Sequence, residues 1–134
     1  MGKSLILVSH GLFSEELKKS TEMIMGPQAD IHTVTLLPEE GPEDFLKKFE
    51  ETVSSLEDYV VFADLLGGTP CNVVSRLILE GNPIQLYAGM NMPMVIGFLN
   101  GELIGEAVDY VEFGASNIRD INAMLASDDD EDDE

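Results

Sequence analysis

The 134-residue sequence has little of three things: cysteine, basic side chains and long hydrophobic runs. Its single cysteine, Cys71, excludes an intramolecular disulfide and fits a reducing compartment. No apolar run approaches the roughly 18 residues that a membrane-spanning helix needs. The first apolar run, residues 5–8, is too short for a signal-peptide core, and the residues after Gly2 do not fit a myristoylation pattern. We therefore expect a cytoplasmic protein.

Basic residues are so scarce that 7 Lys and Arg face 26 Asp and Glu, a formal net charge of −19. The last seven residues are all acidic, which leaves 19 acidic against 7 basic residues, or −12, in residues 1–127. This acidity argues against nucleic acid and anionic membranes as primary partners, because both are bound through basic surfaces. We expect one folded domain over residues 1–126 and a disordered acidic tail over residues 127–134.

Apolar runs that alternate with helical patterns indicate the fold class. Short apolar and β-branched runs predict four strands, at residues 5–8, 31–37, 59–63 and 84–88. Apolar residues at helical spacing predict a helix after each of the first three strands, at residues 12–25, 45–56 and 70–79. Strands and helices that alternate in this way favour an α/β fold with a doubly wound, mostly parallel, flavodoxin-like sheet of strand order 2-1-3-4.

The remaining segments are less regular. Thr69 before Pro70 is typical of an N-cap followed by the first residue of a helix. Further short helices are expected at residues 92–99 and 102–113. The residues themselves leave the segment 118–125 open between a helix and an edge strand, because its apolar positions fit a helical period while its length fits a strand.

The carboxyl ends of the predicted strands hold the polar residues that a ligand site in such a sheet would use. The first strand runs into His10, and Asp64 directly follows the third strand. Neighbouring strands lie about 4.8 Å apart, so Asp64 should reach the imidazole of His10. A carboxylate on one ring nitrogen fixes the tautomer and leaves the other nitrogen free to attack, and histidine is a competent nucleophile.

The turn after Asp64 has the features of an anion-binding element. Gly67 and Gly68 allow close approach of the backbone, and the helix that begins after them offers free N–H groups. The hydroxyl of Thr69 is a further donor. A phosphoryl group on His10 would find its hydrogen-bond donors there. Each residue also has a purely structural interpretation, as a strand-end histidine, a turn-capping aspartate or ordinary loop residues.

Two other residues invite a functional interpretation, but a structural one is favoured for both. His32 lies inside the second predicted strand, and Cys71 follows Pro70 at a helix start, where a packed thiol is the simpler expectation. A metal site built from His10, Asp64 and Cys71 would lack a fourth ligand. We therefore predict no metal.

Three motifs stand out at the predicted strand ends: Ser9-His10-Gly11, the run from Asp64 through Gly67-Gly68-Thr69-Pro70 to Asn72, and Asn91-Met92-Pro93-Met94. Together they resemble the enzyme IIA component of the mannose-type (mannose/fructose/sorbose family) sugar phosphotransferase systems. A shorter stretch, Thr21-Glu22-Met23, also fits. The resemblance runs from about residue 3 to about residue 125, in the right order and at the right spacing.

The resemblance implies a phosphoryl carrier that needs no cofactor. His10 would accept a phosphoryl group from the phosphocarrier HPr and pass it to a histidine of the IIB component, which serves sugar uptake through the membrane subunits IIC and IID. Asp64 would bond the nitrogen that is not phosphorylated, Thr69 would contact the phosphoryl group, and Met23 would lie beside the site. The sugar is not encoded in this chain.

The resemblance also implies a homodimer whose subunits exchange an antiparallel C-terminal strand, which assigns residues 118–125 to a strand. Two features depart from the family pattern. Cys71 stands where an aromatic residue is common, and the chain has no Ala/Pro-rich linker to a IIB domain, so a free-standing IIA subunit is expected. Two alternatives stay open: the phosphoryl-donor subunit of a dihydroxyacetone kinase system, and a flavodoxin-like binding module without histidine chemistry.

Overall fold

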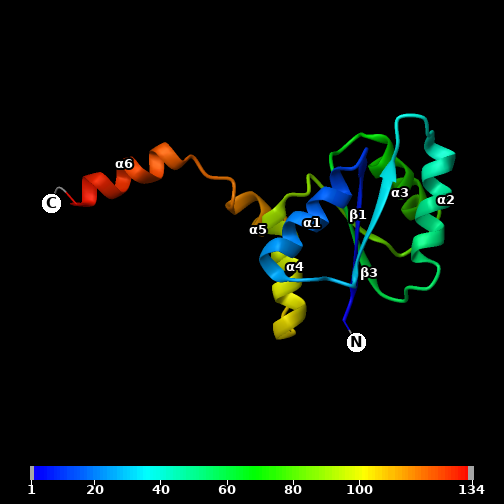
Figure 1. The fold of residues 1–134 in the computed structure, drawn as a ribbon, viewed down its shortest axis with the longest axis horizontal. Helices are drawn as coiled ribbons and strands as arrows, with labels where there is room; N and C mark the ends of the chain where they lie inside the picture. The colour runs from blue at the N-terminus through cyan, green and yellow to red at the C-terminus, as the bar shows by residue number, and fades with distance from the viewer. Residues whose placement is uncertain (1, 133–134) are drawn as a thin grey trace.

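A four-stranded parallel sheet forms the centre of the molecule in the computed structural model, which describes residues 2–132. The strand order β2-β1-β3-β4 confirms the predicted order 2-1-3-4. All three strand pairings are parallel. Figure 1 shows the sheet with helices packed around it. The strands are β1 (Ser4–His10), β2 (Ile31–Leu36), β3 (Tyr59–Ala63) and β4 (Gln85–Ala88).

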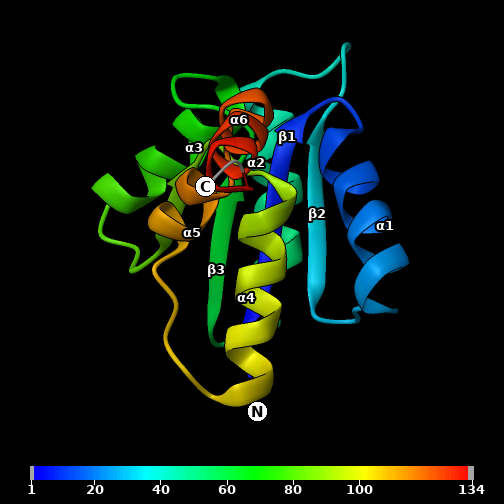
Figure 2. The same ribbon diagram turned by 90° about the vertical axis from the view of Figure 1, so that its left-hand side faces the viewer.

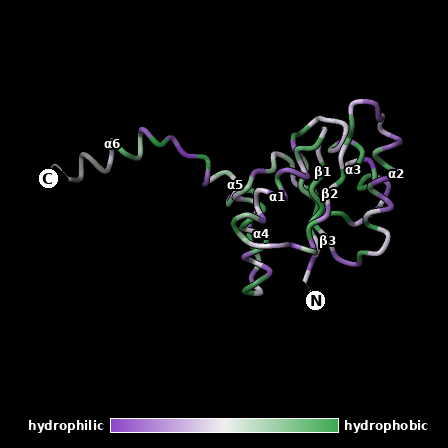
Figure 3. Tube along the Cα trace, in the orientation of Figure 1, coloured by the Kyte–Doolittle hydropathy of each residue, from purple (hydrophilic) through white to green (hydrophobic). Residues whose placement is uncertain are grey.

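Helices follow each strand and cover both faces of the sheet, as Figure 2 shows. Alternate residues of β1 point to opposite faces: Leu5 packs in the core that includes residues of α1 and α4, and Ile6 packs in the core that includes residues of α2 and α3. Figure 3 shows the resulting concentration of apolar residues along the strands. The helices are α1 (Phe13–Met25), α2 (Pro42–Val53), α3 (Thr69–Leu79), α4 (Met92–Ile104), α5 (Tyr110–Ser116) and α6 (Ile121–Asp132).

Three predicted helix boundaries are corrected by the structure. Thr69 is not an N-cap but the first residue of α3, and the extended Gly68 stands before it. The helix expected over residues 92–99 continues to Ile104 and ends at Gly105, whose φ of 69° is left-handed. That turn interrupts the helix expected over residues 102–113, so α5 begins only at Tyr110.

The short helix α5 packs closely on α4 because glycines remove side chains from the contact. A Cβ atom at Gly97 would lie 2.9 Å from the Phe113 ring, and one at Gly114 would lie 2.5 Å from Met94 Cγ. Asn91 adds a polar link, since its Nδ2 donates to the carbonyl oxygen of Gly114 at 3.2 Å. These contacts make α5 the last element of the chain that is seated on the domain.

The C-terminal segment differs from the expectation of an antiparallel edge strand. In the single chain it forms α6, which Figure 1 shows extending away from the domain. Asp120 supports its start, because Oδ1 accepts the N–H of Ala123 at 3.1 Å. Without a neighbouring strand to pair with, the helical period of Ile121, Met124 and Leu125 decides the local structure.

Helix α6 runs to Asp132 and so enters the segment predicted as a disordered acidic tail, residues 127–134, whose disorder stays a prediction. Residues 133–134 lie outside the described residues. No helix within residues 2–132 is both long and apolar enough to cross a membrane.

Candidate functional site

The carboxyl ends of β1 and β3 bring His10 and Asp64 into direct contact. The two strands are hydrogen-bonded neighbours, and the N–H of Asp64 continues their pairing by donating to the Val8 carbonyl oxygen at 3.1 Å. The Oδ2 atom of Asp64 lies 2.7 Å from His10 Nδ1 and accepts the backbone N–H of His10 at 2.9 Å. This geometry confirms the prediction that Asp64 reaches the imidazole.

Asp64 is the anchored member of the pair and His10 the accessible one. The Asp64 side chain is 10% exposed, and its Oδ1 accepts the N–H of Leu65 at 3.0 Å. The His10 side chain is 48% exposed. A carboxylate can only accept, so Nδ1 is the donor, and in the neutral imidazole Nε2 keeps its lone pair. Nε2 makes no hydrogen bond within residues 2–132, which leaves it available to an incoming electrophile.

The turn from Gly67 to Thr69 packs its backbone against the imidazole. A Cβ atom at Gly68 would lie 2.6 Å from His10 Cε1 and 3.3 Å from Nε2, so a side chain there would displace the ring. Gly67 has a φ of 86°, a conformation that favours glycine. The carbonyl oxygens of Gly67 and Gly68 accept from Asn72, at 3.2 Å and 2.9 Å, which ties the turn to α3.

The start of α3 therefore lies next to His10 Nε2. Thr69 is the first residue of this helix and follows the glycine that touches the ring. The first N–H groups of a helix have no partners inside the helix and carry partial positive charge. An anion attached to Nε2 would be close to these donors, although the protein as a whole is strongly acidic.

Sequence reasoning missed a buried serine that supports the turn after β1. Ser9 is fully buried, and its Oγ accepts the N–H of Ser14 at 2.8 Å and donates to the Gly11 carbonyl oxygen at 3.3 Å. These bonds connect both neighbours of His10 to the first turn of α1. The sequence feature that indicates this role is a hydroxyl residue directly before the strand-end histidine, with a helix that starts a few residues later.

Met23 is the one predicted site residue that the structure does not bring to His10. It lies ten residues beyond the start of α1, or about 15 Å along the helix, and is 88% exposed. The reason is that α1 starts beside His10 and runs back toward the opposite end of the sheet. His32 sits within β2 opposite Ile6, away from the strand ends.

Cys71 is 3% exposed and packs with Val73 and Val74 in the core between α3 and the sheet. Its burial agrees with the structural interpretation. Within residues 2–132 no group of three His, Cys, Asp or Glu side chains is placed to hold a metal ion.

A hollow lies at the opposite, amino end of the sheet. It has a volume of about 600 Å³, and Tyr87, Tyr110 and Glu102 line it. Burial raises the pKa of Tyr110, with smaller contributions from nearby Glu102 and from Tyr87. Neither His10 nor Asp64 borders this hollow.

The parallel sheet of order 2-1-3-4, with a histidine bonded to a carboxylate at its carboxyl end, places the molecule in the class of flavodoxin-like α/β proteins. Residues 4–112 match the family model EIIA-man, described as PTS system fructose IIA component. The chain belongs to this family, the mannose-type IIA components of the sugar phosphotransferase systems.

Curated relatives include the fructose-specific EIIA component of Bacillus subtilis, 31% identical over 100 residues, which cover 72% of this chain and 68% of that protein. The mannose-specific EIIAB component of Escherichia coli is 27% identical over 96 residues, 69% of this chain. The match spans only 30% of that longer protein.

Solved structures agree with the fold. The phosphotransferase system component EIIA from Streptococcus agalactiae superposes with a TM-score of 0.81 at 27% identity, over 90% of this chain and 98% of that one. The mannose/sorbose-specific IIA subunit from Enterococcus faecalis gives a TM-score of 0.76 at 31% identity, over 90% and 95% of the two chains.

Proposed function

We propose that this IIA component carries a phosphoryl group on His10, accepting it from phosphorylated HPr and passing it to a IIB component. The observation that carries the proposal is the contact of 2.7 Å between His10 Nδ1 and Asp64 Oδ2, with Nε2 exposed. One nitrogen is held and the other is free, which is the arrangement a nucleophilic imidazole needs.

The transfer is a displacement at phosphorus. The lone pair of His10 Nε2 attacks the phosphorus atom, and the bond from phosphorus to the donor's histidine nitrogen breaks, with its electron pair returning to that nitrogen. Nδ1 of His10 keeps its proton throughout. The ring becomes cationic as the new bond forms, and the Asp64 carboxylate stabilises that charge. In the second transfer the IIB histidine attacks the same phosphorus, and Nε2 leaves.

The turn at the start of α3 supplies the donors for the phosphoryl oxygens. Gly68 already touches the ring, so N–H groups at this helix end lie within reach of a group on Nε2. The hydroxyl of Thr69, the first residue of α3, would add a donor. These groups are ordered before the reaction, so they stabilise developing charge with little reorganisation.

The protein is also proposed to act in the cytoplasm as a homodimer, with the membrane subunits IIC and IID reached only through IIB. One edge of the sheet, β4, is unpaired in the described part of the chain, and α6 exposes Ile121 and Leu125 beyond it. Both features support exchange of the C-terminal segment between subunits, in which α6 would give way to a strand paired with β4.

The function is tested by incubation with enzymatically phosphorylated, radiolabelled HPr. We expect a labelled protein whose phosphoryl bond is acid-labile and alkali-stable, as for phosphohistidine. Replacement of the site histidine, His10→Ala, should abolish labelling, whereas His32→Ala should label like the native chain. Label retained by the His10→Ala variant would overturn the proposal.

A further inference from the structure

Asn72 makes two hydrogen bonds to the turn that lies against His10. Its side-chain Nδ2 donates to the Gly67 carbonyl oxygen at 3.2 Å, and its backbone N–H donates to the Gly68 carbonyl oxygen at 2.9 Å. The backbone bond spans four residues, as in any α-helix, and needs no particular side chain. The side-chain bond depends on the amide of Asn72. One residue of α3 therefore holds two successive peptide groups of the turn.

These two bonds fix the direction of two backbone donors. A trans peptide group is planar, so its N–H points away from its C=O. Asn72 draws the carbonyl oxygens of Gly67 and Gly68 toward α3. The N–H groups of the same two peptides, those of Gly68 and Thr69, therefore point the opposite way, and neither makes a hydrogen bond within residues 2–132. A Cβ atom on Gly68 would lie 3.3 Å from His10 Nε2, so these donors are close to the attacking nitrogen.

The peptide between Gly67 and Gly68 is the one that most needs such a hold. Gly67 has a φ of 86°, and glycine adopts φ values of both signs with little steric cost. A flip of this peptide meets no Cβ atom on either side. It would present the Gly67 carbonyl oxygen where the Gly68 N–H stood, and a carbonyl oxygen repels the oxygens of a phosphoryl group. The side-chain amide of Asn72 opposes the flip, because the flip removes its acceptor.

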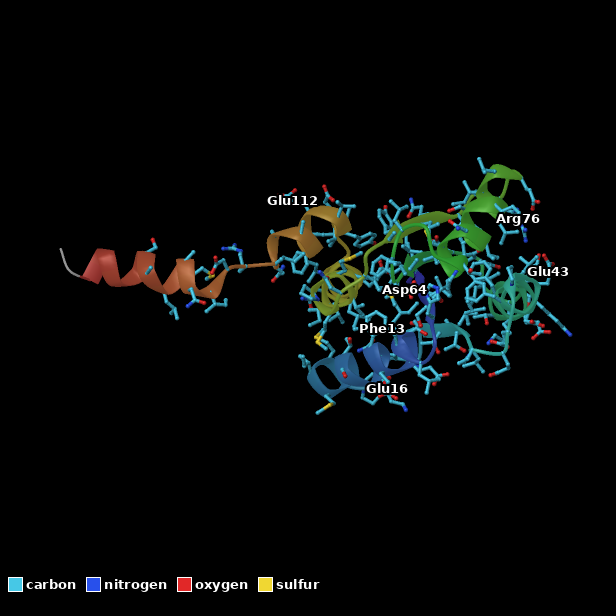
Figure 4. The ribbon with its side chains drawn as sticks, turned by 90° about the horizontal axis from the view of Figure 1, so that it is seen from above. Phe13, Glu16, Glu43, Asp64, Arg76 and Glu112 are labelled. Carbon is cyan, nitrogen blue, oxygen red and sulfur yellow. The ribbon has the colours of Figure 1, made fainter. Side chains whose placement is uncertain are left out.

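The basic residue of α3 does not replace these backbone donors. Arg76 is the one basic residue of the helix, and its Nη2 lies 3.6 Å from Glu43 Oε1 on α2. Figure 4 shows Arg76 and Glu43 on the same outer side of the molecule, away from Asp64. What α3 can offer a phosphoryl group is therefore the set of N–H groups at its start, and their direction matters.

We propose that Asn72 is a positioning residue for phosphoryl transfer, because its side-chain amide locks the Gly67–Gly68 peptide. The N–H of Gly68 is thereby kept directed at the phosphoryl group on His10 Nε2. This inference rests on the proposed function and adds to it the residue that keeps a donor aimed. Asn72 acts only through the turn. A donor that is aimed before the reaction stabilises the charge on the transferring group without first having to reorganise.

The test compares two asparagines that make the same kind of bond at opposite ends of α3. Asn82 Nδ2 donates to the Leu77 carbonyl oxygen at 2.8 Å, five residues back, as Asn72 does to Gly67. Both asparagines are exposed, and alanine favours a helix more than asparagine, so Asn72→Ala should keep α3 intact. Single-turnover labelling by phosphorylated HPr should slow about 10- to 100-fold in Asn72→Ala. Asn82→Ala should stay within about twofold of the native rate.

The amide resonance of Gly68 separates positioning from a general loss of structure. On phosphorylation of the native chain, the proton resonance of the Gly68 N–H should move downfield as it bonds to a phosphoryl oxygen. Asn82→Ala should keep this shift, and Asn72→Ala, labelled by prolonged incubation, should lose it.

Three results would overturn the role of Asn72: equal transfer rates in the two variants, a slow Asn72→Ala variant that keeps the native shift, or a phosphorylated native chain without the shift. A native chain that takes no label from phosphorylated HPr would instead overturn the proposed function itself.

Discussion

The two ends of the β-sheet differ in what they hold. The amino end has a hollow of about 600 Å³, whose aromatic lining includes Tyr87 and Tyr110. The carboxyl end carries His10 and Asp64 in direct contact. The hollow and the candidate site therefore lie at opposite ends of the sheet. Parallel strands end on the same side, and their following turns supply side chains and helix starts that a single reactive atom requires.

The largest loss of transfer rate should come from substitution of Asp64, which follows β3. Asp58, which precedes β3, serves as the control. Asp64→Asn removes the charge that holds the Nδ1 proton, so the rate of transfer from phosphorylated HPr should fall about 10²- to 10⁴-fold. Asp58→Asn, at the amino end of the same strand, should leave the rate unchanged. Rapid-quench measurement of single-turnover labelling checks both. An unchanged rate in Asp64→Asn would remove this carboxylate from the mechanism.

A smaller loss of transfer rate should follow when a methyl group is added at Gly68, against the His10 imidazole. Gly68→Ala introduces a Cβ atom 2.6 Å from His10 Cε1, so the imidazole must move away from the start of α3. Misplacement on this scale should lower the single-turnover rate about 10- to 100-fold. Gly41→Ala is the matched control, since its Cβ atom meets nothing closer than 4.0 Å before another helix start. Equal rates for the two alanine variants would contradict the close packing.

A substitution at the amino end of the sheet should change how the stability depends on pH and leave phosphoryl transfer unchanged. Burial raises the pKa of Tyr110 above that of an exposed tyrosine, so the unfolded chain loses its proton first as the pH rises. The free energy of unfolding should therefore decline above about pH 10, and Tyr110→Phe should reduce that decline. Urea titrations at pH 8 and pH 10.5 measure this, and transfer activity should stay native. A variant that lost transfer would show that the two ends are coupled.

Much of this architecture could be read from local sequence. The strand at residues 59–63 was predicted with its observed bounds. The reason is that a short apolar run between turn residues is typical of a buried strand. Asp64 was identified as the partner of His10 from its place directly after that strand. The N-cap assigned to Thr69 was wrong, because the extended Gly68 takes that place and α3 begins one residue earlier; the contact of Gly68 with the imidazole joins turns far apart in the chain.

By itself, the amino-acid sequence determined the alternation of strands and helices, the sheet order, and the residue types at the strand ends, since these depend on period, turn chemistry and chain direction. The tertiary structure alone decided the contacts that no local pattern marks. It placed Gly68 against the His10 imidazole, left Met23 at the far end of α1, and formed a helix over Ile121–Asp132 in place of a strand. The physical reason is that contacts across the sheet depend on packing and on the presence of a neighbouring strand, neither of which a local pattern encodes.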